Sequence, residues 1–304
     1  MADNSSDKMI YNYVVAYLDI LGQKENLKQF PKVLYEVTNL NSLIPRLEET
    51  YVKTQKIRNT IRDYINGVED QQAKRRGHES FYDNLSDEQR KNIEGMSSPI
   101  EFRYFGDSIT VYSKLTSAAG KLSVTSIYTI IAGVAINMLM GFSNHIVLRG
   151  GIEIGIAVDW EDFGIYGSAL YGAYELESNI ADHPRIVLGD ELIDYLSFWK
   201  KCEGIDFVSK LNKQLANQCF SIIGKDGDGR PILDFLSDNM LSMVEQTDKD
   251  TIFNNLQPKV AEGFRFVMQE YERFGQEKNS KLFRRYKLLS DYYLARLDNW
   301  GLKK

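Results

Sequence analysis

"YNYVVAYLDI", residues 11–20, is the stretch of sequence that decides the fold. It is rich in β-branched and aromatic residues, so it predicts a strand buried on both faces of a sheet. The run ends near an acidic residue, Asp19, and the chain then turns sharply through Leu-Gly-Gln-Lys at residues 21–24. We therefore expect a central strand that brings a carboxylate to the edge of the sheet.

The segments after this strand alternate between helical and strand patterns. They are residues 39–67 (a helix interrupted near Pro45), 101–114 (a hairpin that turns at Gly106 and Asp107), 126–142 (an apolar helix), 145–160 (a second strand pair with paired glycines), 167–181 (an amphipathic helix) and 184–196 (a strand leading into a helix). This order predicts an α+β fold with a ferredoxin-like (split βαβ) sheet and helices packed on one face.

Two parts are expected along the chain. Residues 1–200 hold the predicted sheet, with a charged, weakly patterned surface insertion at 68–98, and residues 201–304 form an extension of a hairpin followed by helices. The Asp-Gly-Asp-Gly turn of that hairpin resembles a calcium loop. Because Arg230 and Ser237 stand where such a loop needs an oxygen ligand and a bidentate carboxylate, we do not expect calcium there.

The composition is that of a globular, cytoplasmic protein. The chain has 304 residues, 43% of them hydrophobic, and a net charge of −5, which argues against general binding to nucleic-acid backbones. Two cysteines and three histidines make a disulfide framework or a Cys/His zinc site improbable. The polar, acidic N-terminus has neither the basic start nor the apolar core of a signal peptide.

Residues 126–142 come nearest to a membrane span. They include Ser126, Thr129 and Asn137 and fall short of the roughly 20 apolar residues that a spanning helix needs. We therefore expect a buried helix and no stable membrane span. A helix that is apolar on nearly all sides should be covered by the sheet on one face and by another helix or a second subunit on the other.

Asp19 and Asp107 each lie at a strand end close to a glycine. If the two strands are neighbours, their carboxylates meet and can share one or two Mg²⁺ or Mn²⁺ ions, with the carbonyl of Ile20 as a third ligand. The turn at residues 21–24 offers backbone N–H groups beside a lysine, which suit a phosphate. The alternative is that Asp19 caps a helix and Asp107 is an ordinary turn residue.

The order of YLDILGQK, FGDSITVY, LRGGIEIG, GIYGSALYGAYELE and PRIVLGDEL resembles the catalytic domain of class III nucleotidyl cyclases, over roughly residues 11–195. The resemblance implies that Asp19 and Asp107 bind two metal ions together with the carbonyl of Ile20. A triphosphate would lie against the turn, which consists of Leu21, Gly22, Gln23 and Lys24. It further implies attack of the 3′-hydroxyl on the α-phosphate, release of pyrophosphate, and a head-to-tail homodimer with active sites at the interface.

Two positions of the predicted amphipathic helix depart from the family. Tyr171 stands where the family has the asparagine that positions the ribose, and Glu175 where it has the arginine that stabilises the pentavalent phosphate. A carboxylate there would repel the developing charge, so either another cation acts or the protein is catalytically inactive. The candidate cations, some of which a partner could supply, are Lys24, Arg149, Arg185, Arg284, Arg285 and Lys287. A structural role on its strand explains Arg149 equally well.

The base-selecting positions depart as well. Arg103 replaces the Lys or Glu of purine cyclases, and Gly164 replaces the Asp that pairs with adenine. Arg103 can donate hydrogen bonds to the carbonyl oxygens of uracil or to the O2/N3 edge of cytosine. The combination resembles the bacterial pyrimidine cyclases of Pycsar antiphage systems, whose cyclic UMP or cyclic CMP activates a separate effector protein. Tyr51 is a candidate for filling the space beside the smaller base, with packing on its helix surface as the alternative.

The sequence therefore predicts a Mn²⁺- or Mg²⁺-dependent cyclase of UTP or CTP. An adenylyl or guanylyl cyclase and a catalytically inactive nucleotide-binding module are the alternatives. A polymerase-like palm or diguanylate cyclase is disfavoured, because Ser108 stands where a second acidic residue would follow Asp107. The preference between UTP and CTP, the role of residues 68–98 and the effector are left open.

Overall fold

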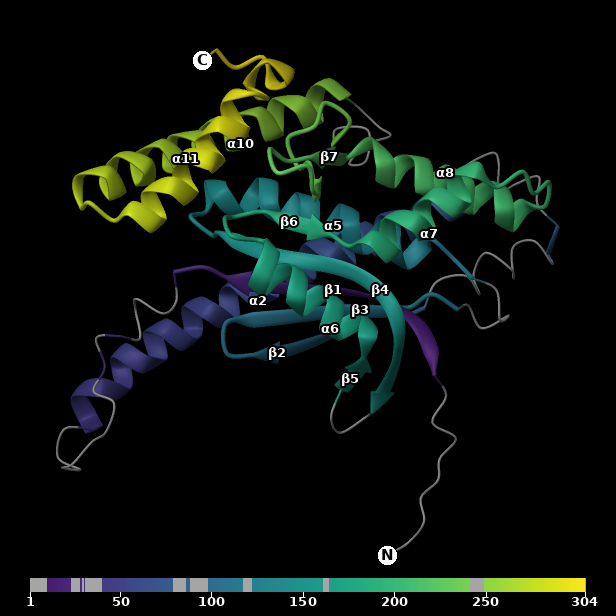
Figure 1. Cartoon of the computed structure of the whole chain (residues 1–304), viewed down its shortest axis with the longest axis horizontal. Coiled ribbons are helices and arrows are strands. Elements are labelled where there is room, and N and C mark those ends of the chain that lie inside the picture. Colours follow the sequence, from purple (N-terminus) through teal and green to yellow (C-terminus); the bar gives the residue numbers. More distant parts are fainter. Residues whose placement is uncertain are drawn as a thin grey trace, which may run out of the picture.

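The computed structural model of the chain is built on one mixed sheet of eight strands with helices against both of its faces (Figure 1). It describes residues 10–22, 28, 30, 40–78, 86–87, 98–116, 122–160, 164–240 and 249–303. The strands are β1 (Tyr11–Ile20), β2 (Glu101–Phe105), β3 (Ser108–Lys114), β4 (Leu148–Trp160), β5 (Gly164–Gly167), β6 (Ile186–Leu188), β7 (Ile223–Lys225) and β8 (Pro231–Leu233). The helices of the described residues are α2 (Leu40–His78), α5 (Thr125–Ser143), α6 (Ser168–Glu175), α7 (Asp190–Lys201), α8 (Phe207–Ser221), α10 (Lys249–Gln276) and α11 (Ser280–Leu294), with the π-helical turn η2 (Leu176–Ile180) and the 3-10 turn η3 (Leu297–Trp300). The fold is α+β, as predicted.

The strands lie in the order β2-β3-β1-β4-β6-β8-β7, and β5 pairs with β4. β1 is antiparallel to both of its neighbours, β3 and β4, whereas β4 and β6 run parallel. The predicted hairpin is confirmed, because β2 and β3 pair antiparallel across a turn at Gly106 and Asp107. β1 therefore lies between the hairpin and β4.

β1 is buried on both faces, as its sequence predicts. Val14 and Leu18 face the larger core, to which α2 and α5 also contribute. Tyr13 and Val15 face the opposite side, where they pack against α6. The expectation that helices cover only one face is therefore wrong. A strand that is apolar on both faces needs cover on both, and α6 supplies it on the second.

Residues 148–160 form one continuous strand, β4, and not the predicted strand pair. That prediction rested on the paired glycines Gly150 and Gly151. Both glycines lie opposite residues of β1 on one side and of β6 on the other. Pairing with a strand on each side keeps the glycine backbone extended, so the glycines mark places where other groups approach closely and do not end the strand.

The helix predicted over residues 39–67 is longer than expected and is not interrupted at Pro45. α2 continues through Pro45 and ends at His78, inside the predicted insertion at 68–98. A proline removes the hydrogen bond of its own nitrogen, and near the start of a long helix the remaining turns compensate for that loss. Apart from residues 86–87, residues 79–97 lie outside the described part of the chain.

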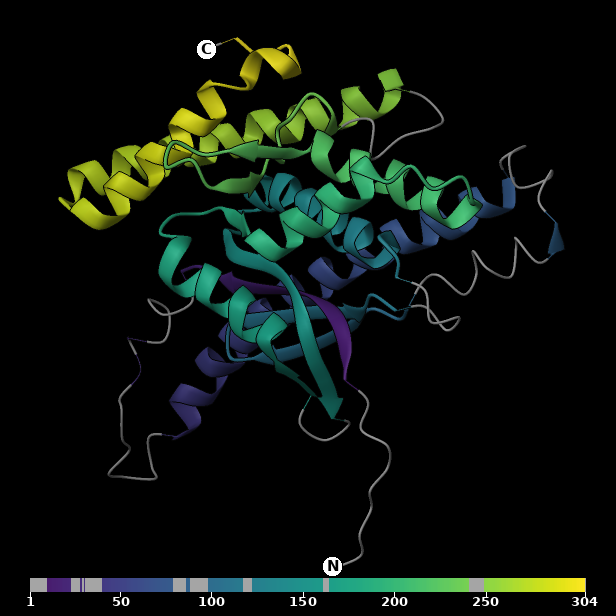
Figure 2. The same ribbon diagram turned by 45° about the vertical axis from the view of Figure 1, so that its right-hand side comes forward.

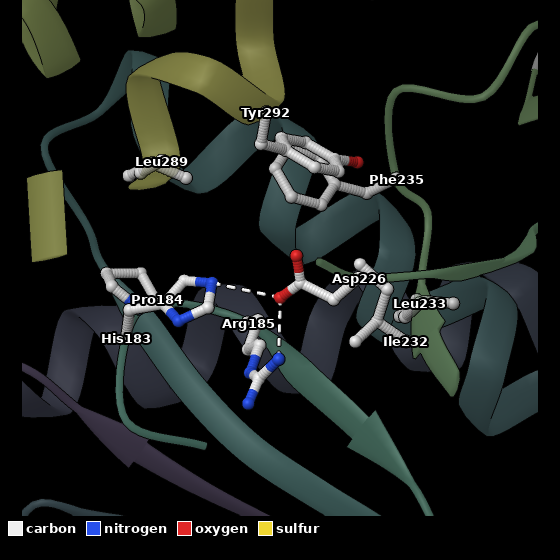
Figure 3. Close-up of a pocket in the computed structure, with 9 residues that line it drawn as sticks. All are labelled: His183, Pro184, Arg185, Asp226, Ile232, Leu233, Phe235, Leu289 and Tyr292. Carbon is white, nitrogen blue, oxygen red and sulfur yellow. Dashed lines mark hydrogen bonds and ion pairs between the residues drawn. The ribbon is translucent and has the colours of Figure 1, made fainter. Parts of the chain in front are cut away.

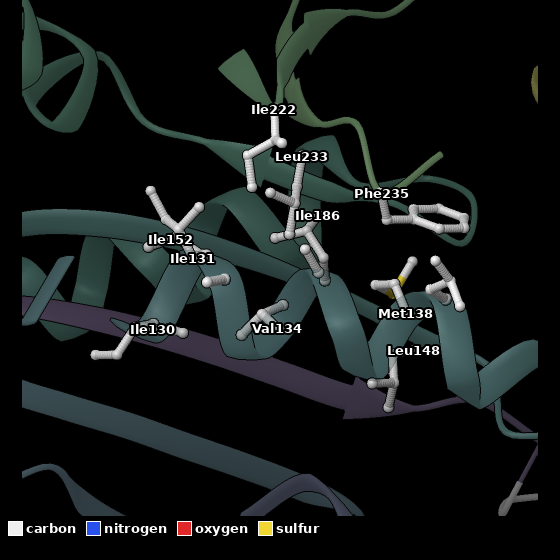
Figure 4. Close-up of a cluster of buried hydrophobic side chains, with 14 of the residues drawn as sticks. Ile130, Ile131, Val134, Met138, Leu148, Ile152, Ile186, Ile222, Leu233 and Phe235 are labelled. Atoms are coloured by element: carbon white, nitrogen blue, oxygen red, sulfur yellow. The ribbon is translucent and has the colours of Figure 1, made fainter. Parts of the chain in front are cut away.

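α5 is the buried helix that the apolar run at residues 126–142 predicts. Its length and composition would suffice to cross a membrane, but 89% of that stretch is buried inside the protein. Val134 and Met138 share one buried cluster with Ile152 of β4 and Ile186 of β6 (Figure 4). Helices α2, α8 and α10 of the same chain also pack against α5. A second subunit is therefore not needed to cover it.

The C-terminal extension continues the same sheet and core. β8 pairs with both β6 and β7, which confirms the predicted hairpin with its Asp-Gly-Asp-Gly turn. α10 and α11 pack on each other, and α10 also packs on α5 (Figures 1 and 2). The predicted boundary at residue 200 falls at the end of α7, and residues on both sides of it belong to one hydrophobic core.

Candidate functional site

Asp19 and Asp107 lie at the same edge of the sheet. Asp19 is the next-to-last residue of β1 and pairs with Ser108, the first residue of β3. Asp107 precedes Ser108 in the hairpin turn, and its backbone carbonyl accepts a hydrogen bond from the N–H of Ile20 at 3.2 Å. The antiparallel pairing of β1 and β3 therefore brings together two acidic residues that are far apart in the sequence.

Arg149 of β4 contacts the carboxylate of Asp19. The two residues are opposite each other in the β1–β4 pairing, and Nη2 of Arg149 is 3.4 Å from Oδ2 of Asp19. The same nitrogen forms an ion pair with Oε1 of Glu177, whose side chain is only 6% exposed. One guanidinium thus lies between two carboxylates in a largely buried place, where charges interact more strongly than in water.

The approach of Glu177 depends on an irregular helical turn and on a glycine. Glu177 lies in η2, a π-helical turn that continues α6, and such turns are rare and frequent at functional sites. Gly151 of β4 faces this segment without room for a side chain. A Cβ at Gly151 would lie 2.4 Å from the carbonyl oxygen of Ala173 and 2.4 Å from Cβ of Leu176. The glycine therefore lets α6 and η2 come close enough to β4 for Glu177 to reach Arg149.

The donor groups of Asp19 and Asp107 are of the kind that binds a divalent ion when a substrate supplies part of the coordination. Carboxylate oxygens suit Mg²⁺ and Mn²⁺, and Mg²⁺ sites commonly combine one or two carboxylates with substrate phosphates. Among the described residues, no group of three or more His, Cys, Asp or Glu side chains could hold a metal ion by itself. The predicted third ligand, the carbonyl of Ile20, belongs to the same strand end. Glu177 offers Arg149 a second carboxylate, so a metal ion at Asp19 would leave the arginine paired.

The predicted phosphate-binding turn is described only at its start. The N–H of Leu21 donates to the carbonyl of Val147 at 2.9 Å, which fixes the exit of β1 beside the start of β4. Gly22 follows and is exposed. Gln23 and Lys24 lie outside the described residues.

Tyr51, which is predicted to line a base pocket together with Arg103, lies on α2. Its side chain is 62% exposed, and its hydroxyl accepts a hydrogen bond from Gln55 at 3.0 Å, one turn further along the same helix. Its side chain is thus open to solvent, and its role in a base pocket stays a prediction.

Arg103 and Gly164, the two positions predicted to select the base, lie side by side. Gly164 has a φ of +77°, and a Cβ there would be 3.3 Å from Nε of Arg103, so the arginine lies where a side chain at 164 would point. The guanidinium carbon is 5.6 Å from the ring centre of Tyr112, and Nη1 is 3.5 Å from Oε2 of Glu101. Burial and the nearby carboxylate of Asp159 raise the pKa of Tyr112, which therefore stays a neutral phenol under the guanidinium.

Tyr171 and Glu175, which depart from the family pattern, bind each other. The hydroxyl of Tyr171 donates to Oε1 of Glu175 at 2.7 Å on the surface of α6. This contact occupies the carboxylate at the position where the family has its arginine. α6 therefore supplies no cation here.

The other candidate cations of the described residues are also paired with carboxylates. Arg185 binds Asp226 at 2.6 Å (Figure 3). It also binds Asp228 at 2.7 Å, so the Asp-Gly-Asp-Gly turn is attached to the start of β6. His183 lies 3.2 Å from the same Asp226, and burial, reinforced by Arg185, lowers the pKa of this histidine to about 4. The remaining pairs are Arg284 with Asp182, Arg285 with Asp182, and Lys287 with Asp291.

Sequence reasoning missed two residues beside the predicted site. Glu177 belongs to an Ala-Tyr-Glu-Leu-Glu run in which only the first glutamate, Glu175, falls on a position of the family pattern. Arg58 of α2 donates a hydrogen bond to the carbonyl of Gly106, directly before Asp107. Arg58 lies two helical turns from Tyr51, so both residues share one face of the helix. This spacing is the sequence signal that could have identified Arg58.

Comparison with known proteins adds no family to this picture. A scan against protein-family models matches none of them, and a search of curated proteins finds no significant match.

Proposed function

We propose that the protein is a metal-dependent pyrimidine nucleotide cyclase, which converts UTP or CTP to the 3′,5′-cyclic nucleotide and pyrophosphate. The observation that carries the proposal is the hydrogen bond from the N–H of Ile20 to the carbonyl of Asp107, because it holds the end of β1, where Asp19 lies, beside the hairpin turn that carries Asp107. Two carboxylates at one sheet edge, beside a turn with a glycine, suit the binding of two metal ions together with a triphosphate.

The topology supports a cyclase-type sheet. The order β2-β3-β1-β4, with α2 between β1 and β2 and α5 between β3 and β4, is the order of the split βαβ arrangement. Class III cyclases carry their metal-binding acidic residues on the first strand and on the hairpin turn of such a sheet. Asp19 and Asp107 occupy these two places.

The chain's own residues would bind and align the nucleotide. Asp19, Asp107 and the Ile20 carbonyl would hold two Mn²⁺ or Mg²⁺ ions, which when bound supply charge stabilisation on the phosphates and favour ionisation of the 3′-hydroxyl. The 3′-oxygen forms a bond to the α-phosphorus, and the bond from that phosphorus to the α,β-bridging oxygen breaks. Pyrophosphate leaves with the electron pair, and the hydroxyl proton passes to water. Holding the reacting atoms in line accounts for much of the rate enhancement.

Arg103 supports a pyrimidine as the base. Its side chain is 43% exposed and lies over Gly164, so the arginine presents hydrogen-bond donors where purine cyclases have an Asp to pair with adenine. A donor-only group matches the carbonyl oxygens of uracil or the O2 and N3 acceptors of cytosine. Tyr51 would fill space beside this smaller base.

A homodimer with active sites at its interface is part of the proposal. Large apolar side chains are exposed on α6 and at the β4–β5 corner, and they are Tyr171 (62%), Tyr174 (46%), Ile156 (57%) and Tyr166 (69%). Such a surface on a charged protein favours burial against a partner. A second copy would cover it and add residues to each site.

The biological role that we propose follows the resemblance. A cytoplasmic cyclase of this kind would make cyclic UMP or cyclic CMP as a second messenger of an antiphage defence system. The messenger would act on a separate effector protein.

The test is turnover of each nucleotide. The purified chain is incubated with Mn²⁺ and ATP, GTP, CTP or UTP, and the products are identified by mass spectrometry. We expect cyclic CMP or cyclic UMP with release of pyrophosphate. Asp107→Asn should lower the rate about a hundredfold or more, because it removes charge from the metal site, whereas exposed Asp298→Asn should leave it unchanged. Cyclic AMP or cyclic GMP as the sole product contradicts the pyrimidine assignment.

A catalytically inactive nucleotide-binding module is the second candidate. The pairing of Arg149 with Asp19 and Glu177 favours it, because this guanidinium is already engaged by carboxylates. Binding of Mn²⁺ and UTP without any cyclic product from the four nucleotides would select this alternative.

A further inference from the structure

Arg58 is a buried cation beside the hairpin turn that carries Asp107. It lies on α2, it is only 9% exposed, and one Nη atom donates to the carbonyl of Gly106. Its guanidinium carbon is 5.0 Å from the ring centre of Tyr104 on β2. Arg58 is thus held between helix and hairpin, next to the backbone of Asp107.

No carboxylate of the described residues pairs with Arg58, in contrast to Arg149, Arg185, Arg273 and Arg296. Its Nε is buried and has no hydrogen-bond partner. A buried guanidinium is costly unless an anion or several acceptors compensate it. One carbonyl and one aromatic face compensate only part of that cost. The unused donor and the uncompensated charge both point to an anion.

The position of Arg58 suits the phosphate end of a nucleotide. Arg58 is seven residues from Tyr51, so the two side chains lie on one face of α2, about 10 Å apart along the helix axis. A nucleoside triphosphate is long enough to contact both. Guanidinium groups also match phosphate oxygens in shape, because two N–H groups can donate in parallel.

We propose that Arg58 binds the polyphosphate of the substrate and stabilises the negative charge that develops on the leaving pyrophosphate. It would thereby supply a cation that α6, with Glu175 in place of the family's arginine, does not. This inference rests on the proposed cyclase function for the identity of the anion. The anion site itself rests on the burial, the missing carboxylate and the unused donor of Arg58.

The test separates the anion site from the reaction. Binding of Mn²⁺ with inorganic tripolyphosphate is measured by calorimetry for the full chain, for Arg58→Met and for Arg58→Lys, and steady-state kinetics are measured with UTP and CTP. Met keeps most of the apolar stem, and Lys keeps the charge without the planar donors. Arg62→Met is the matched control, because Arg62 lies one turn further along α2 and its side chain is 44% exposed.

We expect Arg58→Met to weaken tripolyphosphate binding at least tenfold and to lower kcat at least a hundredfold. Arg58→Lys should recover part of both, and Arg62→Met should stay within twofold of the natural chain. Folded Arg58→Met with unchanged tripolyphosphate binding overturns the proposal. If Arg58→Met does not fold, a crystal of the natural chain with Mn²⁺ and tripolyphosphate decides, because a phosphate oxygen must then lie within hydrogen-bonding distance of Arg58.

The two proposals can fail separately. Arg58-dependent binding of tripolyphosphate without a cyclic product from any nucleotide would refute the cyclase and keep the anion site. If the Arg58→Met variant cyclises UTP or CTP as fast as the natural chain does, the role of Arg58 is refuted and the proposed cyclase function stands.

Discussion

Arg149 and Asp19 face each other across the β1–β4 pairing, with Nη2 of the arginine 3.4 Å from Oδ2 of the aspartate. Glu177 binds the same guanidinium nitrogen. One positive charge between two carboxylates leaves an excess of negative charge, which favours a further cation at this place. The stability of the cluster and the proposed binding of a metal ion by Asp19 are therefore coupled.

Glu177→Gln should destabilise the protein and weaken metal binding. Removing one partner of a largely buried ion pair costs about 3 kcal/mol, which urea unfolding measures. Arg149 would then depend on Asp19 alone, so a metal ion would have to displace its remaining counter-ion. We expect at least a tenfold loss of Mn²⁺ affinity by calorimetry.

The control for Glu177→Gln is the combined replacement Arg149→Met with Glu177→Leu. Because it removes Glu177 together with the arginine that it pairs with, it should be less destabilising than the sum of the two single replacements. An unfolding free energy of Glu177→Gln within about 0.5 kcal/mol of the natural chain would contradict the buried cluster.

Gly151→Ala should destabilise the chain by about 2 kcal/mol or more, because the new Cβ would lie 2.4 Å from the backbone of α6 and force it away from β4. Gly67→Ala is the matched control. Gly67 lies within α2, where a new Cβ would meet no atom within 4 Å, and alanine favours the helix, so a small stabilisation is expected. Equal unfolding midpoints for both variants would argue against the tight α6–β4 contact.

Stability should fall as the pH is lowered from about 6.5 to about 4, because His183 has a pKa of about 4 in the folded chain instead of 6.5. Between these values the unfolded chain binds more protons than the folded one, so acid favours unfolding. The full effect is about 3 kcal/mol. His183→Asn should flatten the dependence in urea unfolding at several pH values, whereas His145→Asn, which changes an exposed histidine, should not. A natural chain equally stable at pH 7 and pH 4.5 would refute it.

If the proposed homodimer shares its active sites, a variant that cannot dimerise should lose both the molecular mass of a dimer and its activity. Tyr166→Arg with Tyr171→Arg places charges on the exposed apolar surface and should turn a dimer into a monomer in light scattering, with at least a tenfold loss of turnover. Ile205→Arg alters a side chain that is 88% exposed after α7, outside that surface, and should change neither property. An active natural chain that is monomeric at all concentrations would exclude the shared site.

Local sequence patterns predicted most of the strands and helices. The buried strand β1, the hairpin β2–β3, the step from β6 to α7 and the C-terminal helices all follow from apolar spacing and turn residues. The continuity of β4 did not, because the conformation of Gly150 and Gly151 is set by the strands on either side of them. The covering of both faces of the sheet by helices likewise depends on which face α6 packs against. The spacing of apolar residues along the sequence does not show this.

The candidate site divides in the same way. The meeting of Asp19 with Asp107 could be predicted, since both residues end strands and neighbouring strands share an edge. Glu177 and Arg58 could not, because each acts through a contact that exists only after helices pack on the sheet. Glu177 contacts Arg149 because Gly151, which has no side chain, lets η2 approach β4. Arg58 contacts the hairpin because α2 packs beside the turn at Gly106.

The cover of α5 by α10 also has a consequence for synthesis of the protein. The ribosome makes the apolar helix Thr125–Ser143 long before it makes Lys249–Gln276, so the nascent chain carries an uncovered apolar helix for much of its translation. Such a segment is a target for chaperones and for the machinery that inserts helices into membranes. A chain that lacks residues 249–276 would therefore be prone to aggregation, although β1 and the β2–β3 hairpin had already been made. Helix α10 thus protects the apolar surface of α5 once the two helices have packed together.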